Sequence, residues 1–392
     1  MRQKNWFTLL WSMLLVMMLI TGLVFSGACK SQTSTSTPTQ TQAAPTQAPT
    51  TQAPTTQAPP VTQTPATTTQ TTTPKPVQVI ELKYASSNSP THPQSIADQA
   101  WIKRIEEQTG GRVHITPYWG GALMASADAY DELVAGVVDI TEFSGAYVKS
   151  GFDIEKAMRV LFYGVATPDI ARKVYDEVRA SFPQIDQEFA KVKILARHAV
   201  SPYQVVTVNK PIKSMADFKG LRLKTTGEFG QIASAIGALG QTIPMADTYV
   251  ALQKNTIDGA FVPAETLQSF KFGEVVKYIT FLNMAVGPTP HRAMNMETWN
   301  KLPPDIQKIF EDNIDWWGKE IEKELFAADD AGLSFAKQNG AQTITLPDSE
   351  LDAFYQAVHK VCLENMAKLD AKGIPGTQIY TKIRELIDKY NP

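Results

Sequence analysis

The sequence predicts that residues 80–392 fold as α/β structure with helices on both faces of a mainly parallel sheet. Short stretches that alternate apolar and polar residues are followed by longer stretches with helical periodicity, which is the arrangement of βαβ units. A long amphipathic pattern then follows Pro303-Pro304. Residues after 77 also have a globular balance of charge, with 39 acidic and 33 basic residues (37 in the chain less the four before residue 77).

The expected elements follow from these periodicities in chain order. Strands are predicted at 80–84, 113–118 and 138–143, with helices at 93–109 and 127–137 between them. Further strands are expected at 194–197, 204–209, 221–224, 243–244 and 259–262. The final pattern predicts a helix from Pro304 to about residue 339. At about 1.5 Å per residue this helix would be roughly 50 Å long, so we expect it to run along two lobes.

The N-terminal residues have the pattern of an export signal. Arg2 and Lys4 precede an apolar run over residues 6–25, and Ser26-Gly27-Ala28-Cys29 follows. A basic segment followed by an apolar one is typical of exported proteins. The small residues before Cys29 resemble a lipobox, so residues 1–29 are predicted to be a lipoprotein signal peptide with Cys29 as the lipidated anchor. An uncleaved membrane-anchoring helix is the alternative, since the run is nearly long enough to span a bilayer.

Residues 30–77 are predicted to be a disordered tether. They are rich in Thr, Gln, Pro and Ala, contain no Asp or Glu, and repeat Thr-Gln-Ala-Pro with small variations. Such a composition buries too little apolar surface to offset the conformational entropy of folding. The favoured interpretation is a spacer that holds a folded domain away from a membrane. The alternative is a disordered tail without a role.

Several classes of chemistry find no support in the sequence. The net charge of −2 argues against nucleic-acid binding through bulk charge. No phosphate-binding loop, dinucleotide fingerprint or nucleophile elbow is found, and the five histidines do not pair at zinc-helix spacing. We therefore predict no cofactor, no metal and no catalytic residue. An enzyme remains an alternative because catalytic groups need not be close in sequence.

A series of short runs resembles the solute-binding proteins of TRAP transporters, the tripartite ATP-independent periplasmic uptake systems. The most specific run is IKSMADFKGLRLK at 212–224. The others, in the family's order, lie at 81–86, 92–93, 109–113, 118–123, 239–240, 244–245, 249–253, 257–259 and 299–304. The resemblance implies a periplasmic-binding-protein-like fold of two lobes joined by hinge strands and the long helix. It also implies an extracytoplasmic location, a small organic-acid ligand and a TRAP permease as partner.

The same resemblance suggests how the chain divides. Lobe I would comprise residues 78–203 and about 284–325, and lobe II residues 204–283 and about 326–392. The alternatives to transport are an extracellular ligand sensor and a hydrolytic enzyme on a similar scaffold.

Lys224 is the first predicted ligand-binding residue. In the family's usual form of this motif, the corresponding position is an arginine that binds a ligand carboxylate with two hydrogen bonds. Here Arg222 and Lys224 are exchanged relative to that form. A lysine can also bind a carboxylate, but it lacks the planar fork of arginine. Arg222, two residues away on the same side of a strand, is the alternative source of positive charge.

The other predicted ligand-binding residues come from matching positions in the family. They are Gln204, Tyr203, Trp119, Ser87, Ser144, Met245, Val262 and Glu265. Trp119 and, in addition, Tyr147 are candidates for stacking on a ligand, with a place in the core as the alternative for each. The alternative for Glu265 is an acid at the N-terminus of a helix. Val262 stands where many relatives have an asparagine, so it replaces a polar amide with apolar surface. With Lys224 as the only well-placed cation, the expected ligand is a monocarboxylate with an apolar or aromatic body.

Overall fold

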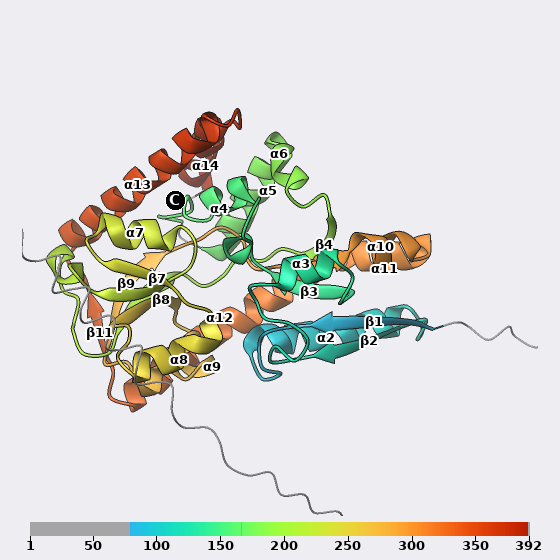
Figure 1. Cartoon of the computed structure of the whole chain (residues 1–392), viewed down its shortest axis with the longest axis horizontal. Helices are drawn as coiled ribbons and strands as arrows, with labels where there is room; N and C mark the ends of the chain where they lie inside the picture. Colours follow the sequence, from blue (N-terminus) through green and yellow to red (C-terminus); the bar gives the residue numbers. More distant parts are fainter. Residues whose placement is uncertain (1–78, 166, 391–392) are drawn as a thin grey trace, which may run out of the picture. The chain divides into compact units, whose positions relative to one another are not determined.

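The computed structural model describes residues 79–165 and 167–390, which form two β-sheets with helices packed against their faces (Figure 1). The predicted signal peptide, Cys29 and the tether at 30–77 lie outside the described residues. Among the described helices, none has the length and apolar character needed to cross a membrane.

Both sheets mix parallel and antiparallel strands. The first has the order β2 (Val113–Tyr118), β1 (Ile80–Ala85), β3 (Ile140–Phe143), β10 (His291–Asn295) and β4 (Val192–Ala196). The second has the order β11 (Gln342–Thr345), β9 (Tyr278–Met284), β5 (Tyr203–Thr207), β8 (Gly259–Pro263), β6 (Arg222–Thr225) and β7 (Leu239–Thr242). Strands β10 and β5 are antiparallel to both of their neighbours. The expected mainly parallel pairing is thus corrected to mixed pairing in both sheets, while the α/β fold implied by the resemblance is confirmed.

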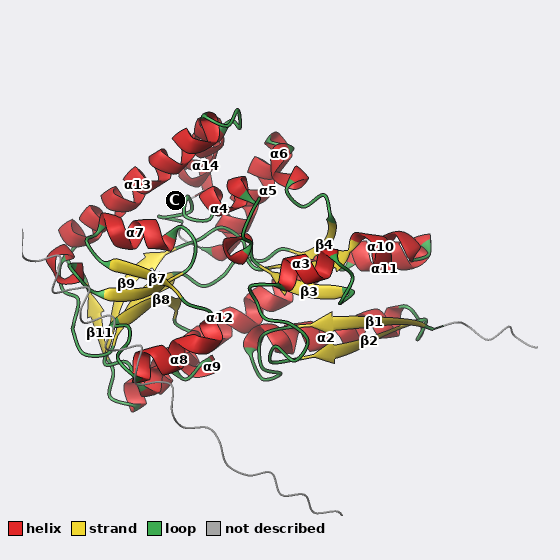
Figure 2. Cartoon of the chain, in the orientation of Figure 1, coloured by secondary structure: helices red, strands yellow, loops and turns green. Residues whose placement is uncertain are grey.

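Helices cover both faces of each sheet, as predicted for the α/β class (Figure 2). The α-helices are α2 (Pro93–Gln108), α3 (Ala129–Val134), α4 (Asp153–Met158), α5 (Pro168–Ser181), α6 (Gln184–Gln187), α7 (Phe229–Ala235), α8 (Met245–Gln253), α9 (Thr266–Ser269), α10 (Met296–Lys301), α11 (Pro304–Asp312), α12 (Ile314–Gln338), α13 (Asp348–Asp370) and α14 (Gly376–Tyr390). Short 3₁₀ turns span Gly145–Tyr147, Met215–Phe218 and Phe272–Glu274. Helices α7 and α13 pack on one face of the second sheet, and α8 and α9 on the other.

The predicted long helix is confirmed over residues 304–338, with a break at Asn313 that divides it into α11 and α12. Helix α12 contacts α2 and β4 beside the first sheet and α9 beside the second. Trp317 of α12 stacks on Trp101 of α2 with ring centroids 3.7 Å apart, and its indole N–H donates to Asp98 at 2.9 Å. The helix is thereby held to elements on both sheets.

Two glycines of α12 let the backbone approach closely. A Cβ atom at Gly318 would lie 2.3 Å from the carbonyl oxygen of Arg197, and one at Gly332 would lie 2.2 Å from that of Ala264. Both distances are shorter than any tolerable contact, so α12 accepts only glycine at these two positions.

The apolar core consists of clusters on the faces of the sheets. Helices α4 and α5 contribute to the cluster that also contains α7, α13 and α14. These two helices belong to the first lobe in the predicted division at residue 203, so their packing crosses that division. The division itself stays a prediction.

Candidate functional site

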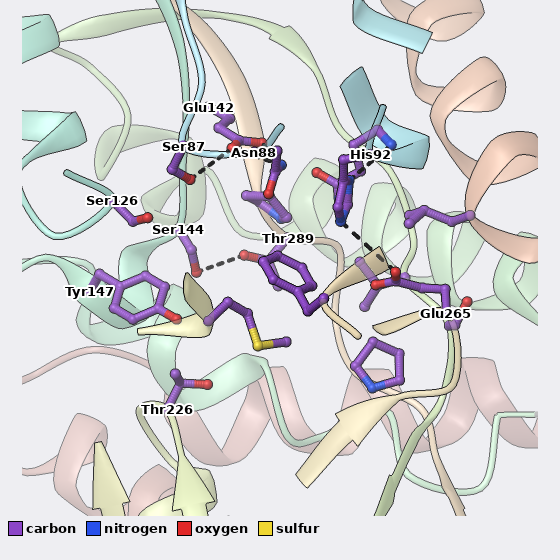
Figure 3. A pocket seen from close by; sticks show the side chains of 18 of the residues that line it. Ser87, Asn88, His92, Ser126, Glu142, Ser144, Tyr147, Thr226, Glu265 and Thr289 are labelled. Atoms are coloured by element: carbon purple, nitrogen blue, oxygen red, sulfur yellow. Dashed lines mark hydrogen bonds and ion pairs between the residues drawn. The ribbon is translucent and has the colours of Figure 1, made fainter. Parts of the chain in front are cut away.

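A cavity of about 140 Å³ lies at the ends of strands from both sheets (Figure 3). Parallel strands β1, β3, β6 and β8 reach it with their carboxyl ends, and antiparallel β5 and β10 with their amino ends, as expected for ligand sites in open α/β sheets. Its lining includes Ser87, Asn88, His92, Gln94, Glu142, Phe143, Ser144, Tyr147, Arg159, Tyr203, Lys224, Thr226, Met245, Pro263, Glu265, Phe270, Thr289, Pro290 and Leu325. An engineered cavity of about 150 Å³ is known to hold benzene, so a small organic molecule fits here.

Lys224 reaches the cavity from β6 and is almost completely buried, with 1% of its surface exposed. Its Nζ lies 3.3 Å from the Met245 sulfur, and among the described carboxylates none forms an ion pair with it. Burial, together with the neighbouring Arg159, lowers the pKa of Lys224 from 10.5 to about 7. A buried ammonium without a counter-charge is unfavourable, so this site favours an anionic ligand.

Arg159, directly after α4, is a second buried cation at the same cavity. Its Nη1 donates to the backbone oxygen of Thr226 at 3.1 Å and to the Thr226 hydroxyl at 3.2 Å. Its Nη2 donates to the Tyr203 hydroxyl at 3.1 Å. Glu228 influences it electrostatically, but no described carboxylate forms an ion pair with its guanidinium. These neutral partners fix the guanidinium in place while leaving its charge uncompensated.

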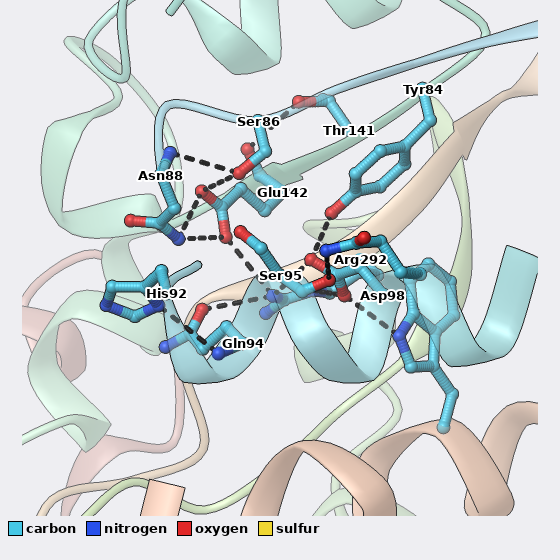
Figure 4. A network of polar contacts seen from close by, with 12 residues as sticks. Tyr84, Ser86, Asn88, His92, Gln94, Ser95, Asp98, Thr141, Glu142 and Arg292 are labelled. Carbon is cyan, nitrogen blue, oxygen red and sulfur yellow. Dashed lines mark hydrogen bonds and ion pairs between the residues drawn. The ribbon is translucent and has the colours of Figure 1, made fainter. Parts of the chain in front are cut away.

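Glu142 is an acidic lining residue whose charge is compensated from within the protein (Figure 4). Its Oε1 accepts from Ser86, Ser87 and Asn88 at 2.9, 3.2 and 3.0 Å. Its Oε2 lies 3.3 Å from Nη2 of Arg292, a fully buried residue that is also paired with Asp98. Glu142 therefore fixes the polar wall after β1 and shares a cation with Asp98, whereas Lys224 and Arg159 have no ion-paired carboxylate among the described residues.

His92 and Glu265 lie across the cavity from Tyr147 and Thr226 (Figure 3). Each is only 4% exposed, and His92 Nε2 is 3.9 Å from Glu265 Oε2. Burial lowers the pKa of His92 to about 3, assisted by Arg292, and raises the pKa of Glu265 to about 8. Both side chains are therefore uncharged near neutral pH.

Most of the residues selected from the sequence come together at this cavity. Lys224, Tyr203, Ser87, Ser144, Met245 and Glu265 line it, as does Tyr147. Arg222 does not, because Asp258 binds its guanidinium with an Nη2–Oδ1 distance of 2.7 Å. Whether any lining residue contacts a ligand stays a prediction.

Three of the selected residues lie away from the cavity. Val262 is fully buried in an apolar cluster of the second sheet. The Gln204 side chain accepts from the backbone N–H groups of Leu282 and Asn283 at 2.7 and 2.9 Å. Trp119 packs edge-on against Tyr84 at 5.5 Å in the core of the first sheet.

Arg159 and His92 are the main lining residues that the sequence reasoning missed. Arg159 was detectable in principle, since it is the only charged residue in the apolar stretch AMRVLFYG at 157–164. A charged residue inside such a stretch is rarely buried without a purpose. His92 was noted only as part of a family motif, and nothing in the sequence indicated its orientation.

Comparisons with known proteins agree with this geometry. Residues 84–369 match the family described as bacterial extracellular solute-binding protein, family 7. A monocarboxylate 2-oxoacid-binding periplasmic protein of Nostoc is 28% identical over 218 residues, covering 55% of this chain and 60% of that protein. The 2,3-diketo-L-gulonate-binding periplasmic protein of Escherichia coli is 26% identical over 71% of this chain and 84% of its own.

Solved structures show the same fold. A TRAP solute-binding protein from Rhodoferax ferrireducens, crystallised with copurified benzoate, has a TM-score of 0.73 and 25% identity. The match covers 79% of this chain and 98% of that one. A TRAP periplasmic solute-binding protein from Desulfovibrio salexigens has a TM-score of 0.67 and 26% identity over 80% of this chain and 97% of its own. The chain thus belongs to family 7 of the bacterial extracellular solute-binding proteins, as a periplasmic-type TRAP solute-binding protein and not an enzyme.

Proposed function

We propose that this protein captures a monocarboxylate with an apolar or aromatic body and delivers it to the membrane subunits of a TRAP transporter. The observation that carries the proposal is a pair of buried cations at one cavity, Lys224 and Arg159, neither of which is ion-paired with a carboxylate of the described residues. A ligand carboxylate would supply the missing negative charge. Phe143, Tyr147 and Phe270 offer apolar surface for the rest of the ligand. The Nostoc relative is named for monocarboxylate 2-oxoacids, and the Rhodoferax protein was crystallised with benzoate, an aromatic monocarboxylate.

The cavity would lie between two lobes that close on the ligand, with residues 78–203 and about 284–325 in one and 204–283 and about 326–392 in the other. Closure would exclude water and strengthen the charge contacts. The chain would be held at the outer face of the membrane by lipid on Cys29, with residues 30–77 as the tether.

A thermal-shift panel tests the ligand class. Benzoate, phenylacetate and branched-chain 2-oxo acids are expected to raise the melting temperature by several degrees, because a ligand at 100 times its Kd stabilises the folded state by about 2.7 kcal/mol. Succinate and malate are expected to produce little shift. Strong stabilisation by the two dicarboxylates alone would contradict the proposal. Mass spectrometry of ligand released from purified protein would then identify the natural ligand.

Binding is also expected to depend on pH through Lys224. Its pKa is about 7 in the empty cavity, and a bound carboxylate favours its charged form, so binding takes up a proton above pH 7. Affinity for phenylacetate should therefore fall as pH rises from 7 to 9, by at most about tenfold per pH unit for one proton. Calorimetric titration at pH 6, 7, 8 and 9 measures this dependence.

Two variants separate the groups that titrate in this range. Lys224→Arg should remove most of the pH dependence, because arginine remains charged throughout. Glu265, whose pKa is about 8, acquires a negative charge in the same window, and Glu265→Gln removes its contribution. Equal affinity of the unmodified protein at pH 6 and pH 9 would exclude the assigned role of Lys224.

The anchor is tested separately from the cavity. Cells expressing the full-length chain and supplied with radiolabelled palmitate should incorporate label into this protein. Cys29→Ala should abolish the labelling, since the cysteine is the acceptor in a lipobox. Persistent labelling of that variant would contradict lipidation at Cys29, and absence of label from both proteins would favour the uncleaved helix.

A further inference from the structure

The end of the cavity formed by His92 and Glu265 contains hydrogen-bonding capacity that no other described residue uses. The 3.9 Å between His92 Nε2 and Glu265 Oε2 is too long for a hydrogen bond. Both residues are buried, and both line the cavity. Buried polar groups normally have partners, so two that face one cavity without bonding each other indicate a ligand group between them.

The surrounding contacts define what these two side chains offer. The backbone N–H of Gln94 donates to His92 Nδ1 at 3.2 Å, so the ring proton is assigned to Nε2, which faces Glu265. Phe270 packs edge-on against the imidazole at 5.3 Å and holds its orientation. His92 therefore presents an N–H donor to the cavity.

Hydrogen bonds also fix the position of Glu265. The Ser269 hydroxyl donates to its Oε2 at 2.6 Å, and its backbone N–H donates to Asp329 at 2.9 Å. Its only ion-pair partner among the described residues is His92, whose pKa of about 3 keeps that ring neutral. A buried carboxyl group without a cation is stable in its protonated form. Glu265 can then donate one hydrogen bond and accept another.

Thr226 lies across the cavity from His92 and Glu265 (Figure 3), and Arg159 is bonded to Thr226 and acts electrostatically on Lys224. A second ligand carboxylate beside Glu265 would be buried close to another acid, and Arg292, the cation that acts on His92, is already paired with Asp98 and Glu142. An uncharged oxygen would be accommodated there, because it can accept from His92 Nε2–H and exchange hydrogen bonds with the Glu265 carboxyl group.

We propose that Glu265 and His92 recognise a hydroxyl or carbonyl oxygen at the end of the ligand remote from its carboxylate, so the ligand class is a hydroxy- or oxo-substituted monocarboxylate. This inference rests on the proposed function and narrows it. The pair selects for an uncharged distal oxygen and against a second carboxylate.

The test compares phenylacetate, its three ring-hydroxylated derivatives (the hydroxy isomers) and the three corresponding carboxyphenylacetates by calorimetric titration of ligand-free protein at pH 6.5. At least one hydroxy isomer should bind about tenfold or more tightly than phenylacetate, because each added hydrogen bond to a buried group is worth roughly a factor of ten. The carboxy compound substituted at that position should bind no more tightly than phenylacetate.

Variants test whether the preference for a hydroxy isomer over phenylacetate comes from His92 and Glu265. In Glu265→Leu the ratio of hydroxy-isomer to phenylacetate affinity should fall several-fold, because only the His92 donor remains. In Glu265→Gln much of the ratio should remain, since the amide also donates and accepts. Arg222→Gln, at an exposed ion pair outside the cavity, should keep the full ratio. Residual phenylacetate binding verifies that each variant is folded.

Two results would overturn the inference while leaving the proposed function intact. One is that no hydroxy isomer binds better than phenylacetate although phenylacetate binding requires Lys224. The other is that Glu265→Leu keeps the preference. If neither phenylacetate nor any substituted form binds, the proposed ligand class is wrong and this inference fails with it.

Discussion

Replacing Lys224 with methionine is expected to weaken phenylacetate binding by about ten- to several-hundredfold. The ammonium is buried beside the Met245 sulfur and has no ion-paired carboxylate among the described residues, so a ligand carboxylate would be its counter-charge. Methionine keeps the volume of the side chain and removes the charge. In the variant the ligand carboxylate loses one of its two cations. Isothermal titration with phenylacetate at pH 6.5 measures the resulting loss of affinity.

The same substitution is expected to stabilise the unliganded protein. The pKa of Lys224 is 10.5 when exposed and about 7 when folded, and each unit corresponds to about 1.4 kcal/mol. Near neutral pH the lysine therefore costs the folded state a free energy on the order of a few kcal/mol. The unfolded chain binds more protons between pH 7 and 10.5, so this cost diminishes as the pH rises through that window.

Thermal unfolding of ligand-free protein at pH 6.5 and pH 10 should thus show a higher melting temperature for Lys224→Met, with the larger difference at pH 6.5. Arg222→Gln serves as the matched control, because Asp258 already pairs with Arg222 outside the cavity. If Lys224→Met binds phenylacetate as tightly as the unmodified protein and has the same melting temperature, Lys224 does not belong to the site. A large loss of affinity only in Arg222→Gln would indicate that Arg222 supplies the charge.

Replacing Arg159 with methionine is expected to reduce affinity at least as strongly, by about a hundredfold. This guanidinium carries the second uncompensated charge, and its bonds to Thr226 and Tyr203 orient two lining residues. Loss of one partner of a charge-assisted contact leaves the other charge buried and unpaired. Calorimetric titration with phenylacetate at pH 6.5 measures the change.

The unliganded Arg159→Met protein should not gain stability as Lys224→Met does, because Tyr203 and Thr226 lose their donor. Arg159→Lys is the informative companion. It keeps the charge but not the planar fork, so we expect an intermediate affinity. Unchanged binding in Arg159→Met would mean that the ligand carboxylate is held by Lys224 alone.

The contrast between these two cations shows how far the sequence predicts the site. Lys224 lies in the most specific family motif, and its place in that motif pointed to it, whereas alternation along β6 put Arg222 on the same side and could not separate the two. Arg159 comes from a short helix outside any of the quoted motifs. Its position depends on the tertiary packing of α4 against α13 and the turn at Gly145–Tyr147, and no local pattern encodes these contacts.

Strand register explains why Tyr203 lines the cavity and its neighbour Gln204 does not. Tyr203 is paired with Pro263 across β5 and β8, and both line the cavity. Gln204 is paired with Val262, one residue along, and points to the opposite face. An irregularity of the pairing between β5 and β9 lies there, and the Gln204 amide fills it. A shift of one residue along a strand reverses the face, which motif matching alone does not resolve.

The fold was predictable where apolar periodicity was strong, as in β1, α2, β2, β3 and the long helix. The strand expected at 243–244 is instead β7 at Leu239–Thr242, whose four residues are all exposed. An exposed edge strand has no alternating apolar pattern from which to infer its limits. Antiparallel β10 depends on pairing with β3 and β4 from distant parts of the chain, and short-range patterns contain no information about such pairs.

The close contacts of Gly318 and Gly332 with backbone oxygens place a constraint on the length of α12. The two glycines are separated by fourteen positions, which corresponds to about 21 Å along the helix and nearly four full turns. Inserting or deleting one residue between them would rotate one contact by about 100° relative to the other and bring a side chain against a carbonyl oxygen. We therefore expect this segment to tolerate substitution on its exposed face but not a change of length, and an alignment gap between residues 318 and 332 would mark a relative that packs this helix differently.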